Sequence, residues 1–271
     1  MSGKVRMTRR VTFSSGHRYW FPHLSAGENR ELFGPWASRY NHGHNFVLDL
    51  TVEGQIDPRT GMVVNIKRID DVLRERIVGK FDQRSINDEI PEFEEQAPSL
   101  ENLMVYIRDD LKDNLPAECT FVGLRLEEMP TFFGELDTKM TLTRSYEFAA
   151  SHRLHSPSMT DQENIDLFGK CNNPAGHGHN YILEVTIEGV PDPRSGMMVD
   201  LEALDDVVNA EVVDRYDHKN LNEDLPEFAS RPTTTEIVTQ EIFNRLDGRI
   251  PARLCRVRLW ETARNMFEVS A

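Results

Sequence analysis

Two short stretches of this sequence occur twice, 135 residues apart. Phe13-Ser-Ser-Gly-His17 returns as Phe148-Ala-Ala-Ser-His152, and His42-Gly-His-Asn45 returns as His177-Gly-His-Asn180. In a chain of 271 residues this spacing leaves about half of the length for each copy, enough for a domain that buries its own core. The repeat therefore predicts two tandem domains, residues 1–138 and residues 139–271.

The overall charge argues against a large polyanionic partner. The formal net charge is −14 at pH 7, whereas nucleic acids and anionic membranes bind clustered Lys and Arg. We therefore expect no nucleic-acid partner and no membrane partner, although a small anionic ligand remains compatible with the composition. No signal-peptide core or membrane span is recognisable, which favours a cytoplasmic protein. The three cysteines are odd in number, and only Cys119 and Cys255 lie at comparable places, near the last strand of each repeat, so we expect no disulfide framework; the third is Cys171.

Strand patterns follow the same order in both copies. In repeat one a strand is expected at residues 6–13, and after a long loop Phe46-Val-Leu-Asp-Leu-Thr-Val-Glu53 alternates apolar and polar residues. The chain then turns at residues 57–61, and we expect a return strand at residues 62–66. In repeat two the corresponding segments are residues 181–188, a turn at 192–196 and a return strand at 197–201.

Two helices and a last strand complete each predicted domain. Apolar residues recur at helical spacing in residues 69–78 and 99–111, and again in residues 204–213 and 234–246. The last strands are expected at residues 122–128 and 256–261, and a short polar linker at 137–141 joins the copies. This order predicts an α+β fold in which each domain is an antiparallel sheet with two helices on one face.

Each repeat carries three histidines that suit a metal ion. Alternate residues of an extended segment point to the same side, so both imidazoles of His-Gly-His can face one ion. Neutral imidazole is a preferred zinc ligand, and three protein ligands leave a fourth position open, as catalytic zinc requires. Surface histidines in a turn would be the simpler interpretation of one copy, but duplication favours a metal site. The candidate zinc ligands are His152, His177 and His179 in repeat two and His17, His42 and His44 in repeat one.

Repeat two also carries candidate proton-transfer residues. Cys171 lies six residues before His177, where nearby imidazoles and a metal would favour its thiolate. Asp217 and His218 are adjacent, and an Asp that orients a His is a recurrent acid–base arrangement. The alternatives are a small buried thiol and a capped loop after a helix.

Repeat one serves as an internal control for these residues. Trp36 stands where repeat two has Cys171, and Gln83 stands where it has His218, although the Asp is kept as Asp82. The repeats thus predict that repeat one keeps a metal site and has lost the proton-transfer chemistry.

A third group of residues is suited to a pterin-like ring. The carboxylate of Glu261, at the end of the last strand, could accept two parallel hydrogen bonds from the guanidine-like edge of an amino-pyrimidinone. The stretch Pro232-Thr-Thr-Thr-Glu236 is also typical of a helix N-terminus. Repeat one keeps Glu128 but has Pro98-Ser-Leu-Glu101 at the second position. The alternatives are an exposed glutamate at a strand end and an ordinary helix N-cap.

With these residues in place, repeat two resembles 6-pyruvoyl-tetrahydropterin synthase, and both repeats resemble the wider family that includes the 6-carboxytetrahydropterin synthases. The resemblance spans nearly the whole repeat. It rests on the stretch from Leu167-Phe-Gly-Lys-Cys171 to Tyr181, on Asp217-His218, on Thr234-Thr-Glu236 and on Trp260-Glu-Thr262. The gap between Cys171 and His177 matches the pyruvoyl synthases better than the carboxy synthases.

The resemblance implies a fold, a cofactor and a reaction. It implies two tandem tunnelling-fold (T-fold) domains, zinc on the histidine triads, and proton transfer by Cys171, Asp217 and His218. It also implies that Glu261 with Thr234 and Thr235 anchors the pterin, which makes Thr234, Thr235, Glu236 and Glu261 the candidate substrate-binding residues. The implied enzyme is a carbon–oxygen lyase that converts 7,8-dihydroneopterin triphosphate to 6-pyruvoyl-tetrahydropterin, with loss of triphosphate. It also implies a homo-oligomer, in which three tandem chains would imitate a six-domain assembly.

Three alternatives to this function stay open at this point. The product could be that of a 6-carboxytetrahydropterin synthase, or the enzyme could cleave the dihydroneopterin side chain. A non-catalytic pterin- or zinc-binding scaffold is the alternative from another class, and the retained Cys171, Asp217 and His218 argue against it.

Overall fold

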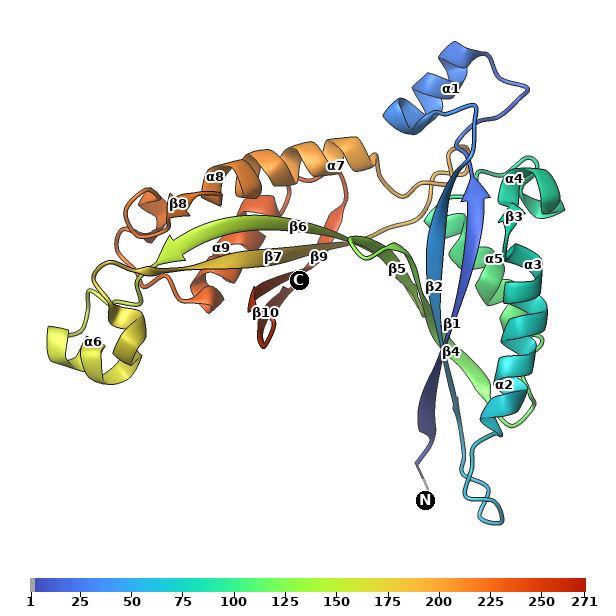
Figure 1. Cartoon of the computed structure of the whole chain (residues 1–271), viewed down its shortest axis with the longest axis horizontal. Helices are drawn as coiled ribbons and strands as arrows, with labels where there is room; N and C mark the ends of the chain where they lie inside the picture. The colour runs from blue at the N-terminus through green and yellow to red at the C-terminus, as the bar shows by residue number, and fades with distance from the viewer. Residues whose placement is uncertain (1–2) are drawn as a thin grey trace. The chain divides into compact units, whose positions relative to one another are not determined.

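The structure is a computed structural model that describes residues 3–271. Its residues form two compact units, each a sheet with helices (Figure 1). Unit 1 holds the first repeat up to Leu142 together with Glu188–Asp200, and unit 2 holds Thr143–Ile187 and Leu201–Ala271. The division follows the duplication except at Glu188–Asp200, which belongs to repeat two by sequence and to unit 1 by contact.

The sheet of unit 1 is built on one long strand pair. β1 (Val5–His17) and β2 (His42–Gly54) pair antiparallel along their whole length, from Val5 opposite Gly54 to His17 opposite His42. The strand order is β5-β4-β2-β1-β3, and β3 pairs with β1 in parallel. The other strands are β3 (Arg84–Ser85), β4 (Thr120–Met129) and β5 (Phe132–Leu136).

Helices cover one face of this sheet because alternate strand residues are apolar. Phe46, Leu48 and Leu50 of β2 are fully buried, and the helices α2, α3 and α5 lie along the same side of the strands (Figure 1). The helical segments are α1 (Ala26–Phe33), η1 (Gly34–Trp36), α2 (Ile66–Leu73), η2 (Arg74–Val78), α3 (Gly79–Phe81), α4 (Ile86–Glu89), η3 (Pro91–Phe93) and α5 (Leu100–Lys112).

Unit 2 repeats this plan. Its strand order is β10-β9-β7-β6, and a short β8 pairs with β6 in parallel. The strands are β6 (Met140–His152), β7 (His177–Glu188), β8 (Lys219–Asn220), β9 (Arg253–Thr262) and β10 (Asn265–Ser270). The helical segments are α6 (Asp161–Phe168), η4 (Gly169–Asn172), α7 (Leu201–Val208), η5 (Asn209–Val213), α8 (Asp214–Tyr216), η6 (Pro226–Phe228) and α9 (Thr235–Leu246).

The predicted α+β class and the two tandem domains are confirmed, but the return strands at residues 62–66 and 197–201 are wrong. In repeat one the amide of Asp57 donates to the carbonyl of Met62 over 2.9 Å, and no strand follows. The side chain of Asn65 instead accepts a hydrogen bond from Lys67 and caps α2. The apolar residues before Asn65 therefore lead into a helix, and residues 55–65 form a loop.

Sequence patterns also missed several elements, among them β5, β10, α1 and α6. Every residue of β5 except Glu135 is buried, so its sequence lacks the period-two alternation of a half-buried strand. β10 is largely exposed and offers little apolar signal. α1 and α6 lie in segments expected to be loops, yet each begins with a capping box, Ser25 with Glu28 and Thr160 with Glu163. Within residues 3–271 no helix is long and apolar enough to cross a membrane.

Candidate functional site

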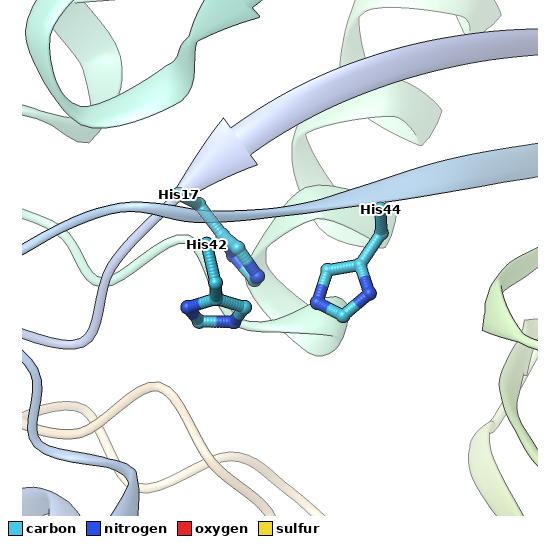
Figure 2. Close-up of side chains that lie close together, drawn as sticks. All are labelled: His17, His42 and His44. Carbon is cyan, nitrogen blue, oxygen red and sulfur yellow. The ribbon is translucent and has the colours of Figure 1, made fainter.

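The three histidines of repeat one meet where β1 ends and β2 begins. His17 lies directly opposite His42 in the strand pair, and His44 follows two residues later on the same face. Figure 2 shows the three rings turned toward one another. Each ring offers one nitrogen to a group whose members all lie within 4.8 Å of one another. The register of two antiparallel strands thus produces a potential metal centre.

Repeat two builds the same arrangement from His152, His177 and His179. The ring centroid of His152 lies 4.7 Å from that of His177 and 5.2 Å from that of His179. The equivalent distances from His17 in repeat one are 4.5 and 5.2 Å. The two candidate centres therefore share one geometry to within a few tenths of an ångström.

A main-chain carbonyl fixes the tautomer of the buried histidine in each triad. Nδ1 of His17 lies 2.9 Å from the carbonyl oxygen of Pro98, and Nδ1 of His152 lies 2.8 Å from that of Thr233. Because a carbonyl only accepts, both Nδ1 atoms must donate, which leaves the Nε2 lone pairs for a metal. Burial favours this neutral form, since it lowers the pKa of His152 and lowers the pKa of His17 to about 3.

The remaining ring nitrogens fit a cation. Among the described residues no hydrogen bond reaches the buried Nε2 atoms of His17, His44, His152 and His179 or Nδ1 of His177. A buried ring nitrogen without a partner costs free energy that metal coordination would recover. Each centre supplies three nitrogen donors, a set that suits zinc and leaves a fourth position open.

Glu261 lies beside the repeat-two centre and is held by Thr235. The Thr235 hydroxyl donates to Oε1 of Glu261 over 2.7 Å, and the same oxygen lies 3.7 Å from Nε2 of His152. Burial raises the pKa of Glu261, but hydrogen bonds from Thr235 and Asn265 outweigh it, so the net pKa lies below its ordinary value. The carboxylate is therefore ionised at neutral pH and able to accept hydrogen bonds from a ligand.

In repeat one no hydroxyl holds the corresponding glutamate, because the residues that carry a hydroxyl in repeat two are replaced by apolar ones. Leu100 stands at the position of Thr235, and Phe46 at that of Tyr181. Glu128, the counterpart of Glu261, lies with Oε1 3.3 Å from Nε2 of His44. Its carboxylate thus approaches a histidine that would bind the metal.

Cys171 and the pair of Asp217 and His218 are anchored on either side of His152. The amide of Ala149 donates to Oδ1 of Asp217 over 2.7 Å, and the amide of Leu154 donates to the carbonyl of Cys171 over 2.9 Å. These anchor points lie three residues before and two residues after His152. The backbone therefore brings both groups to the end of β6, where the triad is formed.

The side chains of these residues do not form a relay in the structure. Nδ1 of His218 lies 2.7 Å from Oδ2 of Asp217, and the imidazole is 84% exposed. Among the contacts that lower the pKa of Asp217, the hydrogen bond from the amide of Ala149 has the largest effect. Within residues 3–271 no hydrogen bond or ion pair joins the half-buried Cys171 to either residue. The structure thus pairs Asp217 with His218 and leaves the thiol separate.

Repeat one keeps the backbone of this region without its reactive side chains. The amide of Ser14 donates to Asp82, and the amide of Gln83 donates to the carbonyl of Ser14 over 2.7 Å. Gln83 and His218 both adopt positive φ, 58° and 56°, which is unusual for residues other than glycine. The strained turn is therefore common to both repeats. Trp36, in the position of Cys171, is 37% exposed.

The residues around Glu236 are arranged differently in the two repeats. Thr234 is the N-cap residue of α9 without a capping side-chain bond, and Glu236 is exposed. Glu101, the counterpart of Glu236 in repeat one, is only 3% exposed. Its carboxylate accepts a hydrogen bond from the amide of Met198 over 2.6 Å. Burial raises the pKa of Glu101 to about 7.

Sequence reasoning missed two residues of this region. Tyr181 is fully buried below the triad, with its ring centroid 5.7 Å from that of His179, and burial raises its pKa. Its exchange for Phe46 between otherwise similar strands was a visible signal. Glu101 was overlooked because nothing in its own repeat indicates that Met198, 97 residues away, covers it.

These features define an α+β protein with two tandem domains and two three-histidine centres suited to a metal. The family model described as 6-pyruvoyl tetrahydropterin synthase matches residues 6–138 and again residues 141–271. The chain belongs to this family, as the sequence resemblance predicted, and it is an enzyme of the lyase class.

Relatives with related names match about half of the chain. A 6-pyruvoyl tetrahydrobiopterin synthase of Drosophila melanogaster is 44% identical over 128 residues, which cover 46% of this chain and 76% of the relative. That of Homo sapiens is 42% identical over 139 residues, covering 51% of this chain and 96% of the relative. A solved Caenorhabditis elegans 6-pyruvoyl tetrahydropterin synthase aligns with a TM-score of 0.47 and 40% identity, covering 48% of this chain and 94% of that one. A 6-carboxy-5,6,7,8-tetrahydropterin synthase of Rickettsia typhi is 24% identical over 144 residues, covering 53% of this chain and 94% of the relative.

Proposed function

We propose that repeat two is a zinc-dependent pterin synthase that converts 7,8-dihydroneopterin triphosphate to 6-pyruvoyl-tetrahydropterin with elimination of triphosphate. The observation that carries this proposal is the gathering of three groups around the end of β6. These are the histidine triad, the ionised Glu261 held by Thr235, and the tethered Cys171 with Asp217 and His218. Repeat one has only part of this set.

Pterin binding would depend on Glu261. Its ionised carboxylate can accept two parallel hydrogen bonds from the amino-pyrimidinone edge of the ring. The hydroxyl of Thr235 fixes the orientation of the carboxylate through its 2.7 Å hydrogen bond. Thr234 and Glu236 lie at the same helix N-terminus and would bind the remaining polar atoms of the pterin.

His152, His177 and His179 would hold the zinc ion. Bound zinc would supply Lewis acidity, which polarises substrate oxygens and makes the neighbouring C–H bonds more acidic. The chain contributes neutral imidazoles, since burial and the carbonyl of Thr233 keep His152 in the metal-binding tautomer.

Proton movement would fall to Cys171 and to the pair of Asp217 and His218. Cys171 would take a proton from the substrate side chain as its thiolate. Asp217 orients the His218 imidazole through Nδ1, so that Nε2 is free to deliver a proton. Because His218 is 84% exposed, it can recover that proton from solvent. The side chain would thus be oxidised and the ring reduced without an external redox cofactor.

Repeat one, residues 1–138, would be a degenerate domain that binds metal without turnover. Its triad keeps the geometry of repeat two, but Trp36 and Gln83 replace the thiol and the imidazole. By analogy with the family, the chain would act as a homo-oligomer, with three tandem chains in place of six single domains.

Incubation of the purified protein with zinc and 7,8-dihydroneopterin triphosphate tests the proposed reaction. We expect release of triphosphate and a product with the mass of 6-pyruvoyl-tetrahydropterin. Cys171→Ala should abolish both, whereas Trp36→Ala, its counterpart in repeat one, should not. The mass of a 6-carboxy product or of a cleaved side chain would instead identify one of the related reactions. Binding of zinc without triphosphate release would refute the enzymatic proposal.

A further inference from the structure

Tyr19 is a buried aromatic residue of repeat one to which the proposed function gives no role. It follows His17 by two residues, and only 7% of it is exposed. Its ring centroid lies 5.3 Å from that of His17 and 6.3 Å from that of His42. The phenol ring thus lies against two members of the repeat-one triad.

Apolar residues from other segments pack around Tyr19. Ala97 belongs to the same buried cluster and lies two residues before the N-cap residue of α5. Met197, from the loop Glu188–Asp200, packs against this cluster. The cluster thus extends from the triad to the N-terminal end of α5. It consists of Tyr19, Phe21, Phe33 and Ala97.

The polar groups at this end of α5 are also occupied. The hydroxyl of Ser99 donates to the carbonyl of Gly196 over 2.6 Å, and the amide of Met198 donates to the carboxylate of Glu101 over 2.6 Å. Both partners belong to the docked loop Glu188–Asp200. The phenol ring therefore fills the space between the triad and a helix end that the chain itself covers.

The corresponding place in repeat two is where the pterin is proposed to bind. There Glu261 lies 3.7 Å from Nε2 of His152 and is held by Thr235 of α9. A ring that is bound to this carboxylate lies between the triad and the N-terminus of α9. The residue at the position of Tyr19 is Leu154, which is half-buried and has no ring.

The neighbours of Tyr19 differ between the repeats in the same direction. Ser156 stands at the position of Phe21 in the cluster. Asn172 stands at the position of Ala37, which packs against the cluster. The surroundings that are apolar and aromatic in repeat one are therefore more polar in repeat two, as a polar ring such as a pterin requires.

The cavity that borders the repeat-one triad does not reach the N-terminus of α5. Its volume is about 330 Å³, and His44, Gln83 and Arg84 are among the residues that line it. The described residues around it include neither Glu128, the counterpart of Glu261, nor any residue of α5. This triad is therefore open on the side of Gln83 and not on the side of the glutamate.

We propose that Tyr19 occupies the position of the pterin ring in repeat one, so that this repeat holds a metal ion and admits no pterin. The phenol ring takes the place of an aromatic ligand against the triad. The chain therefore has one pterin site, although it has two candidate metal centres. The identity of the excluded ligand rests on the proposed function, whereas the filling of the site by Tyr19 does not.

Equilibrium dialysis with neopterin, the oxidised form of the proposed substrate without its triphosphate, tests the proposal. The wild type should bind one neopterin per chain. Tyr19→Leu introduces the residue of repeat two and should bind two, the second about 5-fold more weakly because Leu100 offers no hydroxyl. Tyr19→Phe keeps the ring and should bind one. Tyr40→Leu is the matched control and should also bind one, because Tyr40 is 78% exposed in the same repeat.

Two glutamate variants identify the repeat that holds each ligand. Glu261→Ala should abolish binding in the otherwise wild-type chain and should leave only the added site in Tyr19→Leu. Glu128→Ala should remove only the added site. A Glu261→Ala chain that still binds one neopterin would overturn the proposal, and this result does not depend on how the Tyr19 variants fold.

The remaining outcomes separate the role of Tyr19 from the proposed function. Circular dichroism and metal content verify that Tyr19→Leu is folded; if it then gains no neopterin site, the proposal is wrong. A wild type that binds one neopterin but releases no triphosphate from the proposed substrate would refute the reaction and leave the role of Tyr19 supported. A wild type that binds none, with one bound by Tyr19→Leu, would refute pterin binding by repeat two and still support that role.

Discussion

The metal centres of the two repeats share a frame and differ in their surroundings. His17 in repeat one and His152 in repeat two each donate through Nδ1 to a main-chain carbonyl. The distances between ring centroids differ between the two centres by at most a few tenths of an ångström. Four neighbouring positions have changed from polar or reactive in repeat two to apolar or unreactive in repeat one. These are Trp36 for Cys171, Gln83 for His218, Leu100 for Thr235 and Phe46 for Tyr181.

This difference shows that metal binding and proton transfer are physically separable in the fold. The triads lie on paired strands, whose register fixes three side chains together. Cys171 and His218 lie in connecting segments, where a substitution disturbs neither the register nor the core. A duplicated domain can therefore lose its reactive groups and keep its metal geometry.

Removal of one histidine from each triad should produce the largest and clearest contrast. His152→Ala and His17→Ala should each lower the metal content from two ions per chain to one, because each removes a ligand of a separate centre. Only His152→Ala should abolish triphosphate release. Metal analysis together with the activity assay checks this. A single ion in the wild type that His17→Ala leaves in place would mean that repeat one binds none.

Substitution of the thiol should have the next largest effect. Cys171→Ala should lower kcat by about 10²- to 10⁴-fold, the usual contribution of a general base, with metal content unchanged. Trp36→Ala in repeat one should leave kcat within about 2-fold, since no reacting group is altered there. Equal losses of kcat in both variants would contradict the asymmetry between the repeats.

The buried Glu101 at the N-terminus of α5 should make the stability of the fold depend on pH. Glu101 has a pKa of about 7 in the folded chain against a reference of 4.5. The folded state thus binds more protons than the unfolded state between these values, and stability falls as pH rises through them, by about 3 kcal/mol at most. Glu101→Gln keeps an acceptor for Met198 and should remove this pH dependence.

The control for this prediction is Glu236→Gln, because Glu236 is exposed. Its unfolding curves at pH 5 and pH 8 should shift with pH as those of the wild type do. Chemical denaturation at both pH values measures the difference. An undiminished loss of stability at pH 8 in Glu101→Gln would rule out Glu101 as the titrating group.

Replacement of the buried tyrosine should produce the smallest change. Tyr181→Phe introduces the residue that repeat one carries at position 46 and removes a hydroxyl close to Thr235. We expect about a 5-fold rise in KM with little change in kcat, because loss of a polar group near the anchor costs about 1 kcal/mol. Thr235→Val should produce a similar rise. A fall in kcat without a change in KM would assign Tyr181 to the chemical step.

Sequence patterns predicted those parts of the fold that depend on local periodicity. The strand of Phe46, Leu48 and Leu50 and the helices α5 and α9 follow from apolar spacing alone. The histidine triads followed from the repeat, because two matching sets are informative where one would not be. The placement of Glu101 against Met198 depends on a contact between distant segments, which no local pattern encodes.

The docked loop Glu188–Asp200 has one further consequence for a fused chain. Because it is covalently linked to the repeat whose helix it covers, its docking is intramolecular, with an effective concentration on the order of millimolar for a short flexible connection. Dilution of the protein would therefore leave the contacts of Gly196 with Ser99 and of Met198 with Glu101 in place.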